Sequence, residues 1–243
     1  MKEHINTAII ALSIVITGYL VSQAWQYRYT NEERIRVKGL GSKDFNADLI
    51  VWSGSFSKKS LDLKEAYTLL DLDRESIKKY MITKGLELKQ LVFSSITIEK
   101  LFDDVYDDNG NKIKSTFNGY QLRQTLQVES KEVDKVELIS REVSELIHQG
   151  IEFYSQKPEY YYTKLAELKI EMIATATKDA QSRAKKIADN AGSSLGKLTK
   201  AEMGVFQIIA QNSSEDFSWG GSFNTSSKRK TANITVNLEY STR

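Results

Sequence analysis

The chain of 243 residues contains no cysteine, one proline and two histidines. The lack of cysteine excludes disulfides, thiolate metal sites, a catalytic thiol and a lipidated cysteine. It leaves the compartment open, because cysteine-free proteins occur on both sides of a membrane. His148 is the histidine outside the N-terminal segment, and it falls near the end of an expected helix, where a merely solvated histidine is common. The sequence therefore indicates no catalytic residues, no cofactor and no metal site, and we expect a protein that is not an enzyme.

A surplus of charge of one sign is also missing. Lysine and arginine number 34 against 32 for aspartate and glutamate, which gives a net charge of +2 at pH 7. Such a balance provides no general attraction to nucleic acid. Aromatic and basic residues do mix near residues 157–164 and 219–230, but a strand-to-helix corner and a solvated loop explain both stretches. We expect no nucleic-acid partner, and the residues identify no small-molecule ligand.

Charge is absent altogether from residues 5–27, whose centre reads AIIALSIVITGYLV. A run of this length predicts a helix that crosses a bilayer, with Trp25 and nearby tyrosines at the interface. The alternative is a cleaved signal peptide, with Ser22 and Ala24 before the cut. We therefore expect residues 1–30 to be a transmembrane anchor or a signal segment.

Residues 31–243 are expected to form one domain. One helix opens at Asp62 and ends at Gly85, a hairpin turns at Asn109–Gly110, a second helix begins after Ser130, and the longest helix covers about 163–191. With the strand-like stretches between them, the order is ββα-ββα-βα-ββ. This order predicts an α+β fold, in which three helices pack on a mostly antiparallel sheet after an N-terminal transmembrane helix.

The longest helix has alanine at every fourth position. Successive positions i and i+4 drift by only ~40° around a helix, so these alanines form one slowly turning stripe. The opposite face carries Lys185 and other polar residues, which suit water. The pattern predicts that the stripe packs closely against the sheet. The stripe consists of Ala176, Ala180, Ala184 and Ala188.

Three stretches of the chain resemble the SIMPL-domain family, the bacterial periplasmic immunogenic or oxidative-stress-defence proteins. The alanine-rich helix ends in ATKDAQSRAKKIADNAGSSLGKL, the opening strands read IRVKGLGSKDFNADLIVWSGSF, and the closing strand reads ITVNLEY. The elements occur in the family's order over about residues 34–241. Asn46–Ala47 precede Asp48 where many relatives have proline directly before the acid, which puts the local turn in doubt but not the fold.

The resemblance implies an envelope protein with a role in oxidative-stress or DNA-damage responses, and an oligomer as one mode of action. It implies no catalytic residues, because the family has none agreed. It also implies a body that faces the periplasm, either held by a single-pass helix in the inner membrane through residues 5–27 or soluble after signal cleavage. A hydrolase acting on an envelope substrate is the alternative function.

One loop offers a candidate surface for protein contacts. It reads DFSWGGSF, in which large aromatic side chains are flanked by glycine, and such residues are typical interface anchors. We therefore expect binding or self-assembly through Phe217, Trp219 and Phe223.

Overall fold

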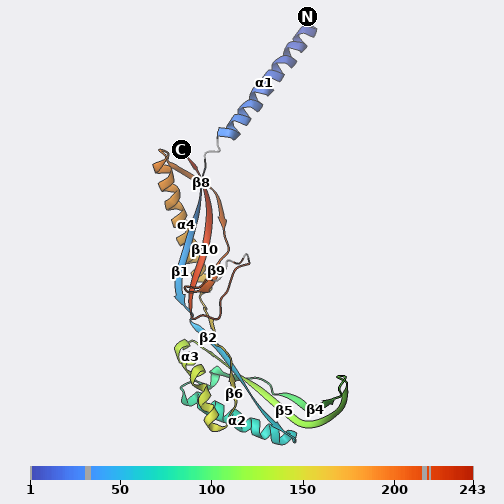
Figure 1. The fold of residues 1–243 in the computed structure, drawn as a ribbon. Helices are drawn as coiled ribbons and strands as arrows, with labels where there is room; N and C mark the ends of the chain where they lie inside the picture. The colour runs from blue at the N-terminus through green and yellow to red at the C-terminus, as the bar shows by residue number, and fades with distance from the viewer. Residues whose placement is uncertain (1, 31–33, 215–217, 219, 243) are drawn as a thin grey trace.

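The computed structural model describes residues 2–30, 34–214, 218 and 220–242. Over these residues the chain forms four α-helices and ten strands in two antiparallel sheets, an α+β fold (Figure 1). The prediction of a single sheet under three helices is wrong. The physical reason lies in the first strand, which pairs with the last strand instead of with its neighbour in the sequence.

The first sheet is made mostly from the two ends of the domain. Its strand order is β1-β10-β8, and β9 also pairs with β10. Helix α4 lies along one face of it and contacts β1, β10 and β8 (Figure 1). The elements are β1 (Arg34–Asn46), β8 (Leu195–Met203), β9 (Gln207–Ala210), β10 (Arg229–Thr242) and α4 (Leu165–Asn190).

The alanine stripe of α4 is fully buried against this sheet, as predicted. The partner surface on β1 is Gly39 and Gly41, which face the helix. A Cβ atom added at Gly39 would lie 2.6 Å from the Cβ of Ala180, and one added at Gly41 would lie 2.5 Å from the carbonyl oxygen of Met172. Glycine on the strand and alanine on the helix are therefore both needed for the close approach of the two backbones.

The second sheet has the strand order β3-β5-β2-β6, with β4 on β5 and β7 on β2. Helices α2 and α3 cover one face of it, and the core between them is built from large side chains such as Trp52, Phe56, Ile77 and Leu126. The strands are β2 (Leu49–Ser60), β3 (Leu91–Phe93), β4 (Thr97–Tyr106), β5 (Lys112–Ser130), β6 (Phe153–Ser155) and β7 (Glu159–Tyr161). The helices are α2 (Leu63–Thr83), α3 (Val133–Glu142) and the 3-10 helices η1 (Leu88–Gln90) and η2 (Val143–Gln149).

The chain crosses between the sheets at Ala47 and Asp48. Pairing of β1 with β10 ends at Asn46, and the amide of Asp48 then donates to the carbonyl of Tyr161 at 3.0 Å. The Asp48 carboxylate accepts hydrogen bonds from the backbone and the hydroxyl of Thr163, at 2.7 and 2.8 Å. These bonds fix a corner that would otherwise be free to turn, so the missing proline does not disturb the fold.

The hairpin predicted at Asn109–Gly110 is confirmed, because β4 and β5 pair across it. Its turn differs in detail. Gly110 has a φ of +81°, whereas Asn109 keeps a negative φ. The Asp107 carboxylate closes the turn instead, by accepting the amides of Asn109 and Asn111 at 2.9 and 2.7 Å.

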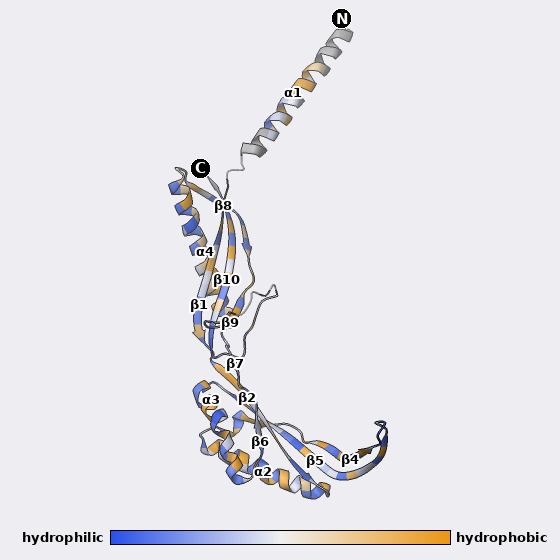
Figure 2. Cartoon of the chain, viewed as in Figure 1, coloured by the Kyte–Doolittle hydropathy of each residue, from blue (hydrophilic) through white to orange (hydrophobic). Residues whose placement is uncertain are grey.

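The N-terminal helix α1 (Lys2–Thr30) corrects a second prediction. No helix among the described residues is long and apolar enough to cross a membrane, so the predicted transmembrane helix over residues 5–27 is wrong. Thr17 and Gln23 place polar side chains within the apolar run of this helix. Figure 2 shows hydrophobic and hydrophilic residues mixed in the coloured middle part of this helix. The division of the chain into residues 1–30 and 31–243 and the signal-peptide alternative stay predictions.

Candidate functional site

The face of the first sheet opposite α4 carries an open groove of about 420 Å³. Its charged residues stand in rows across the three strands, because residues opposite each other in antiparallel strands share a face. Glu239 of β10 lies between Arg36 of β1 and Lys200 of β8, and Asn237 lies between Lys38 and Glu202. We call this surface the basic groove, and it is formed by Arg34, Arg36, Lys38, Lys200, Glu202, Asn237 and Glu239.

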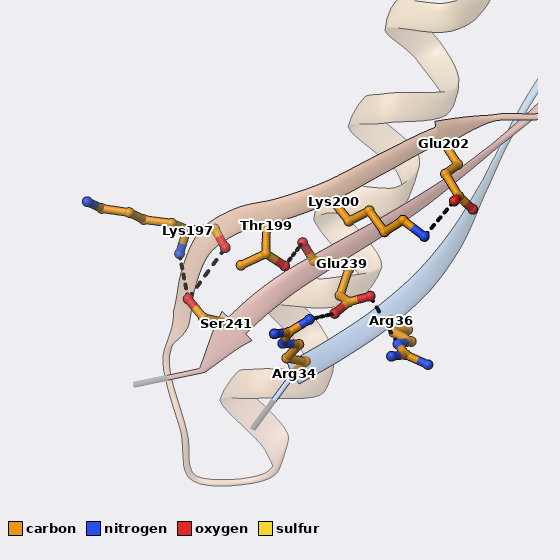
Figure 3. Close-up of polar contacts among 8 residues, drawn as sticks. All are labelled: Arg34, Arg36, Lys197, Thr199, Lys200, Glu202, Glu239 and Ser241. Carbon is orange, nitrogen blue, oxygen red and sulfur yellow. Dashed lines mark hydrogen bonds and ion pairs between the residues drawn. The ribbon is translucent and has the colours of Figure 1, made fainter. Parts of the chain in front are cut away.

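Glu239 organises the basic groove (Figure 3). Its side chain is only 8% exposed, and it accepts from Nη1 of Arg34 at 2.6 Å and from Nε of Arg36 at 3.1 Å. The hydrogen bond from Arg34 lowers the pKa of the Glu239 carboxyl, and the positive charges of Arg36 and Arg34 lower it further against the opposing effect of burial. A nearly buried carboxylate thus holds two guanidinium groups in place, while the side chain of Arg36 stays 79% exposed.

Strands β4 and β5 extend beyond the second sheet as a two-stranded arm (Figure 1). Strand β2 pairs with β5 only as far as the pair Ser60 and Tyr120, so β5 beyond this point has β4 as its partner. An aromatic row runs outward along the arm from the core. Tyr120 packs against the core, its ring lies 5.2 Å from that of Phe117, and Phe117 lies 5.8 Å from Phe102. Phe102 is 52% exposed, so the apolar face of the core continues into solvent.

The end of the arm is acidic. We call residues 103–108 the acidic tip; they read DDVYDD and contain four aspartates and no basic residue. Asp104 pairs with Lys112 at 2.8 Å, and Asp107 holds the turn. Val105 and Tyr106 between the aspartates are exposed. The arm therefore presents apolar and acidic groups together.

The loop predicted to make protein contacts is only partly described. Phe217 and Trp219 lie outside the described residues. Phe223 is 50% exposed, and the segment around it is held to β9, because the amide of Asn224 donates to the carbonyl of Ile208 at 3.0 Å. Contact through this loop stays a prediction. Sequence reasoning missed the basic groove, because its members come from both ends of the chain and become neighbours only when β1 pairs with β10.

The family model that matches the chain covers residues 35–240, from β1 to β10, and is described as SIMPL, a protein of unknown function. The chain belongs to the SIMPL family. The resemblance drawn from the alanine-rich helix and the two terminal strands is thereby confirmed. A comparison with curated proteins finds no match. The SIMPL domain of this chain spans both sheets, so the basic groove and the arm both belong to it.

A hydrolase with a Ser-His-acid site would require His148, the single histidine of the SIMPL domain, to meet acidic side chains in a concave site. His148 lies exposed on η2, and it lines neither the basic groove nor two further grooves among the described residues, which involve Lys228 and Leu88. Nearby Glu145 is engaged by Lys84 at 2.9 Å. Within the described part of the chain no group of three or more histidine, aspartate or glutamate side chains is arranged to hold a metal ion. The expectation that the chain is not an enzyme stays a prediction.

Proposed function

We propose that this SIMPL-family protein acts by self-assembly, through its β4–β5 arm, and not by catalysis. The observation that supports the proposal is the aromatic row that leaves the core and ends in exposed Phe102. A two-stranded hairpin is only marginally stable in water, and an exposed apolar face on one usually marks a contact surface. A second protein surface that covers the row would bury the aromatic side chains and stabilise the arm.

The test is sedimentation velocity of the purified full-length chain beside the variant Phe102→Ser. We expect the wild type to associate and Phe102→Ser to shift towards the monomer. Phe223→Ser is a matched control, because Phe223 is 50% exposed against 52% for Phe102 and lies on the other sheet's loop. Circular dichroism of both variants checks that the fold is intact.

The outcomes separate the candidate surfaces. Dissociation by Phe223→Ser alone would move the contact to the loop that the sequence indicated. Association that both variants retain would assign it to another apolar surface, such as the exposed residues of α1. A wild type that stays monomeric would contradict the proposal.

The cellular role that we propose is in the response to oxidative stress or DNA damage in the cell envelope, and its support is the family resemblance alone. A strain that lacks the gene should be more sensitive to peroxide or to a DNA-crosslinking agent, and wild-type protein should restore growth. Phe102→Ser should fail to restore it if assembly is what the role requires. Full restoration by a monomeric variant would separate the role from assembly.

A further inference from the structure

The acidic tip and the basic groove carry opposite charges and lie far apart in one chain. Figure 1 places the arm at the far end of the second sheet, while the groove lies on the first sheet, where Arg34 pairs with Ser241 near the C-terminus. The tip carries four aspartates, one of which is paired with Lys112, and the groove carries four basic side chains against two acidic ones. Because the two surfaces cannot meet within one copy, the complementary charge points to a second copy.

The groove is prepared to receive carboxylates. Glu239 accepts from Nε of Arg36, so the two terminal nitrogens of this guanidinium remain available for a second carboxylate. Arginine binds carboxylates through paired N–H groups, and these charge-assisted bonds are stronger than neutral ones. The exposed ammonium group of Lys38, two residues along the same strand, adds a second positive charge on this face. The opening of about 420 Å³ between them gives room for side chains of a hairpin turn.

The tip is suited to enter the groove. Its turn is held by Asp107, so the turn residues themselves lose little conformational freedom on binding. Asp103 and Asp108 are exposed on either side of Val105 and Tyr106, which would add apolar contact between the charges. A surface of this kind combines steering by charge with burial of aromatic area.

We propose that the acidic tip of one copy docks in the basic groove of a second copy. This inference rests on the proposed self-assembly and adds a charged contact to the apolar one made by the aromatic row. The two surfaces differ, so the contact is heterologous: it runs head to tail, and it closes into a ring or continues as a filament depending on the rotation between copies. Salt should weaken it, because the charges meet at the surface.

Charge reversal on each side tests the contact, with sedimentation velocity of the full-length chain as the readout. The tip variant is Asp103→Lys with Asp108→Lys, and the groove variant is Arg36→Glu with Lys38→Glu. Each variant alone should weaken self-association by about tenfold or more. An equimolar mixture of the two should associate again, because every contact in the mixture can pair a reversed tip with a reversed groove or a native tip with a native groove.

A matched control reverses two charges elsewhere, Lys185→Glu with Lys186→Glu on the exposed face of α4. This variant should associate like the wild type. Persistence of wild-type association in both the tip and the groove variants would overturn the inference while leaving self-assembly standing. Loss of association that the mixture fails to restore would overturn it as well, since the two charges would then not face each other. A wild type that is monomeric would overturn both the inference and the proposed function.

Discussion

The two sheets of this domain are covered by helices in opposite ways. Helix α4 packs on the first sheet through alanine side chains, and Gly39 and Gly41 of β1 lie opposite them. Helices α2 and α3 instead pack on the second sheet through a core of large side chains such as Trp52 and Phe56. The first arrangement gains dispersion contacts between backbones, and the second gains buried apolar area. We therefore expect the contact between α4 and the first sheet to be sensitive to added side-chain atoms, and the core of the second sheet to be sensitive to their removal.

We expect the largest loss of stability when a large side chain in the core of the second sheet is truncated. Phe56 is fully buried on β2, and its ring meets that of Phe93 edge-on at 6.4 Å. We expect Phe56→Ala to lower the free energy of unfolding by about 3 to 5 kcal/mol, because it removes apolar burial and leaves a cavity. Chemical denaturation monitored by circular dichroism measures the change. Tyr154→Ala on the exposed surface of β6 is the control and should cost far less. A loss of similar size in both variants would show that the second core is loosely packed.

We expect the next largest loss of stability when a side-chain atom is added at the contact between α4 and the first sheet. Gly39→Ala adds one methyl group that would collide with the backbone of α4 at Ala176 and with Ala180. Replacing glycine by alanine in an open strand usually stabilises it, so the sign of the effect is decisive. We expect a loss of about 3 kcal/mol, at the upper end for overpacking, because backbone atoms must move. The same change at Gly220, where nothing lies within 4 Å, is the control. A stabilised Gly39→Ala would mean that α4 does not lie at the distance described.

The alanine side of the same contact gives a third prediction. Ala184→Leu should lower the free energy of unfolding by about 1 to 3 kcal/mol, because the larger side chain must push α4 away from the sheet. Lys185→Leu, one residue along on the exposed face, should change it by less than about 0.5 kcal/mol. Alanine, leucine and lysine are all good helix formers, so the pair controls for helix propensity. Equal denaturation midpoints would show that the stripe is not a close contact.

The close-packed half was the easier one to predict from the sequence. The alanine stripe has a helical period, and a face of small side chains has few uses other than a close approach. The pairing of β1 with β10 could not be predicted in this way, because strands adjacent in the sequence usually pair and nothing local distinguishes the exception. That pairing builds the first sheet and the basic groove together. The arm was half predicted: Asn109–Gly110 marked the turn, but the exposure of Phe102 depends on β2 ending at Ser60.

The apolar N-terminal run shows a different limit. Its lack of charge is a composition signal, and composition alone predicted a span that the described helix does not provide. The uncharged residues include serine, threonine and glutamine, whose polarity a count of charges ignores. The alanine period of α4 was a better guide to structure than the lack of charge near the N-terminus, because a period shows which side chains share one face of a helix.

The smallest expected effect concerns the polar face of the first sheet, and it depends on pH. The pKa of Glu239 is lowered in the fold, chiefly by its hydrogen bond from Arg34, from an ordinary value of 4.5. A carboxyl whose folded pKa is lowered contributes stability that is fully present above the unfolded pKa and is lost as the pH falls through the folded one. The wild type should therefore lose stability below about pH 4.5, and Glu239→Gln should lose less over the same range, because it cannot be protonated.

The measurement is the denaturant midpoint of each protein at pH 7 and at pH 3. At pH 7 Glu239→Gln should be less stable than the wild type, since Arg34 and Arg36 lose a charged partner that they share. At pH 3 the gap between the two midpoints should be smaller than at pH 7. Glu202→Gln is the control, because its ion pair with Lys200 is exposed and such pairs contribute little. A constant gap between wild type and Glu239→Gln at both pH values would mean that the carboxylate acts through its shape and hydrogen bonds and not through its charge.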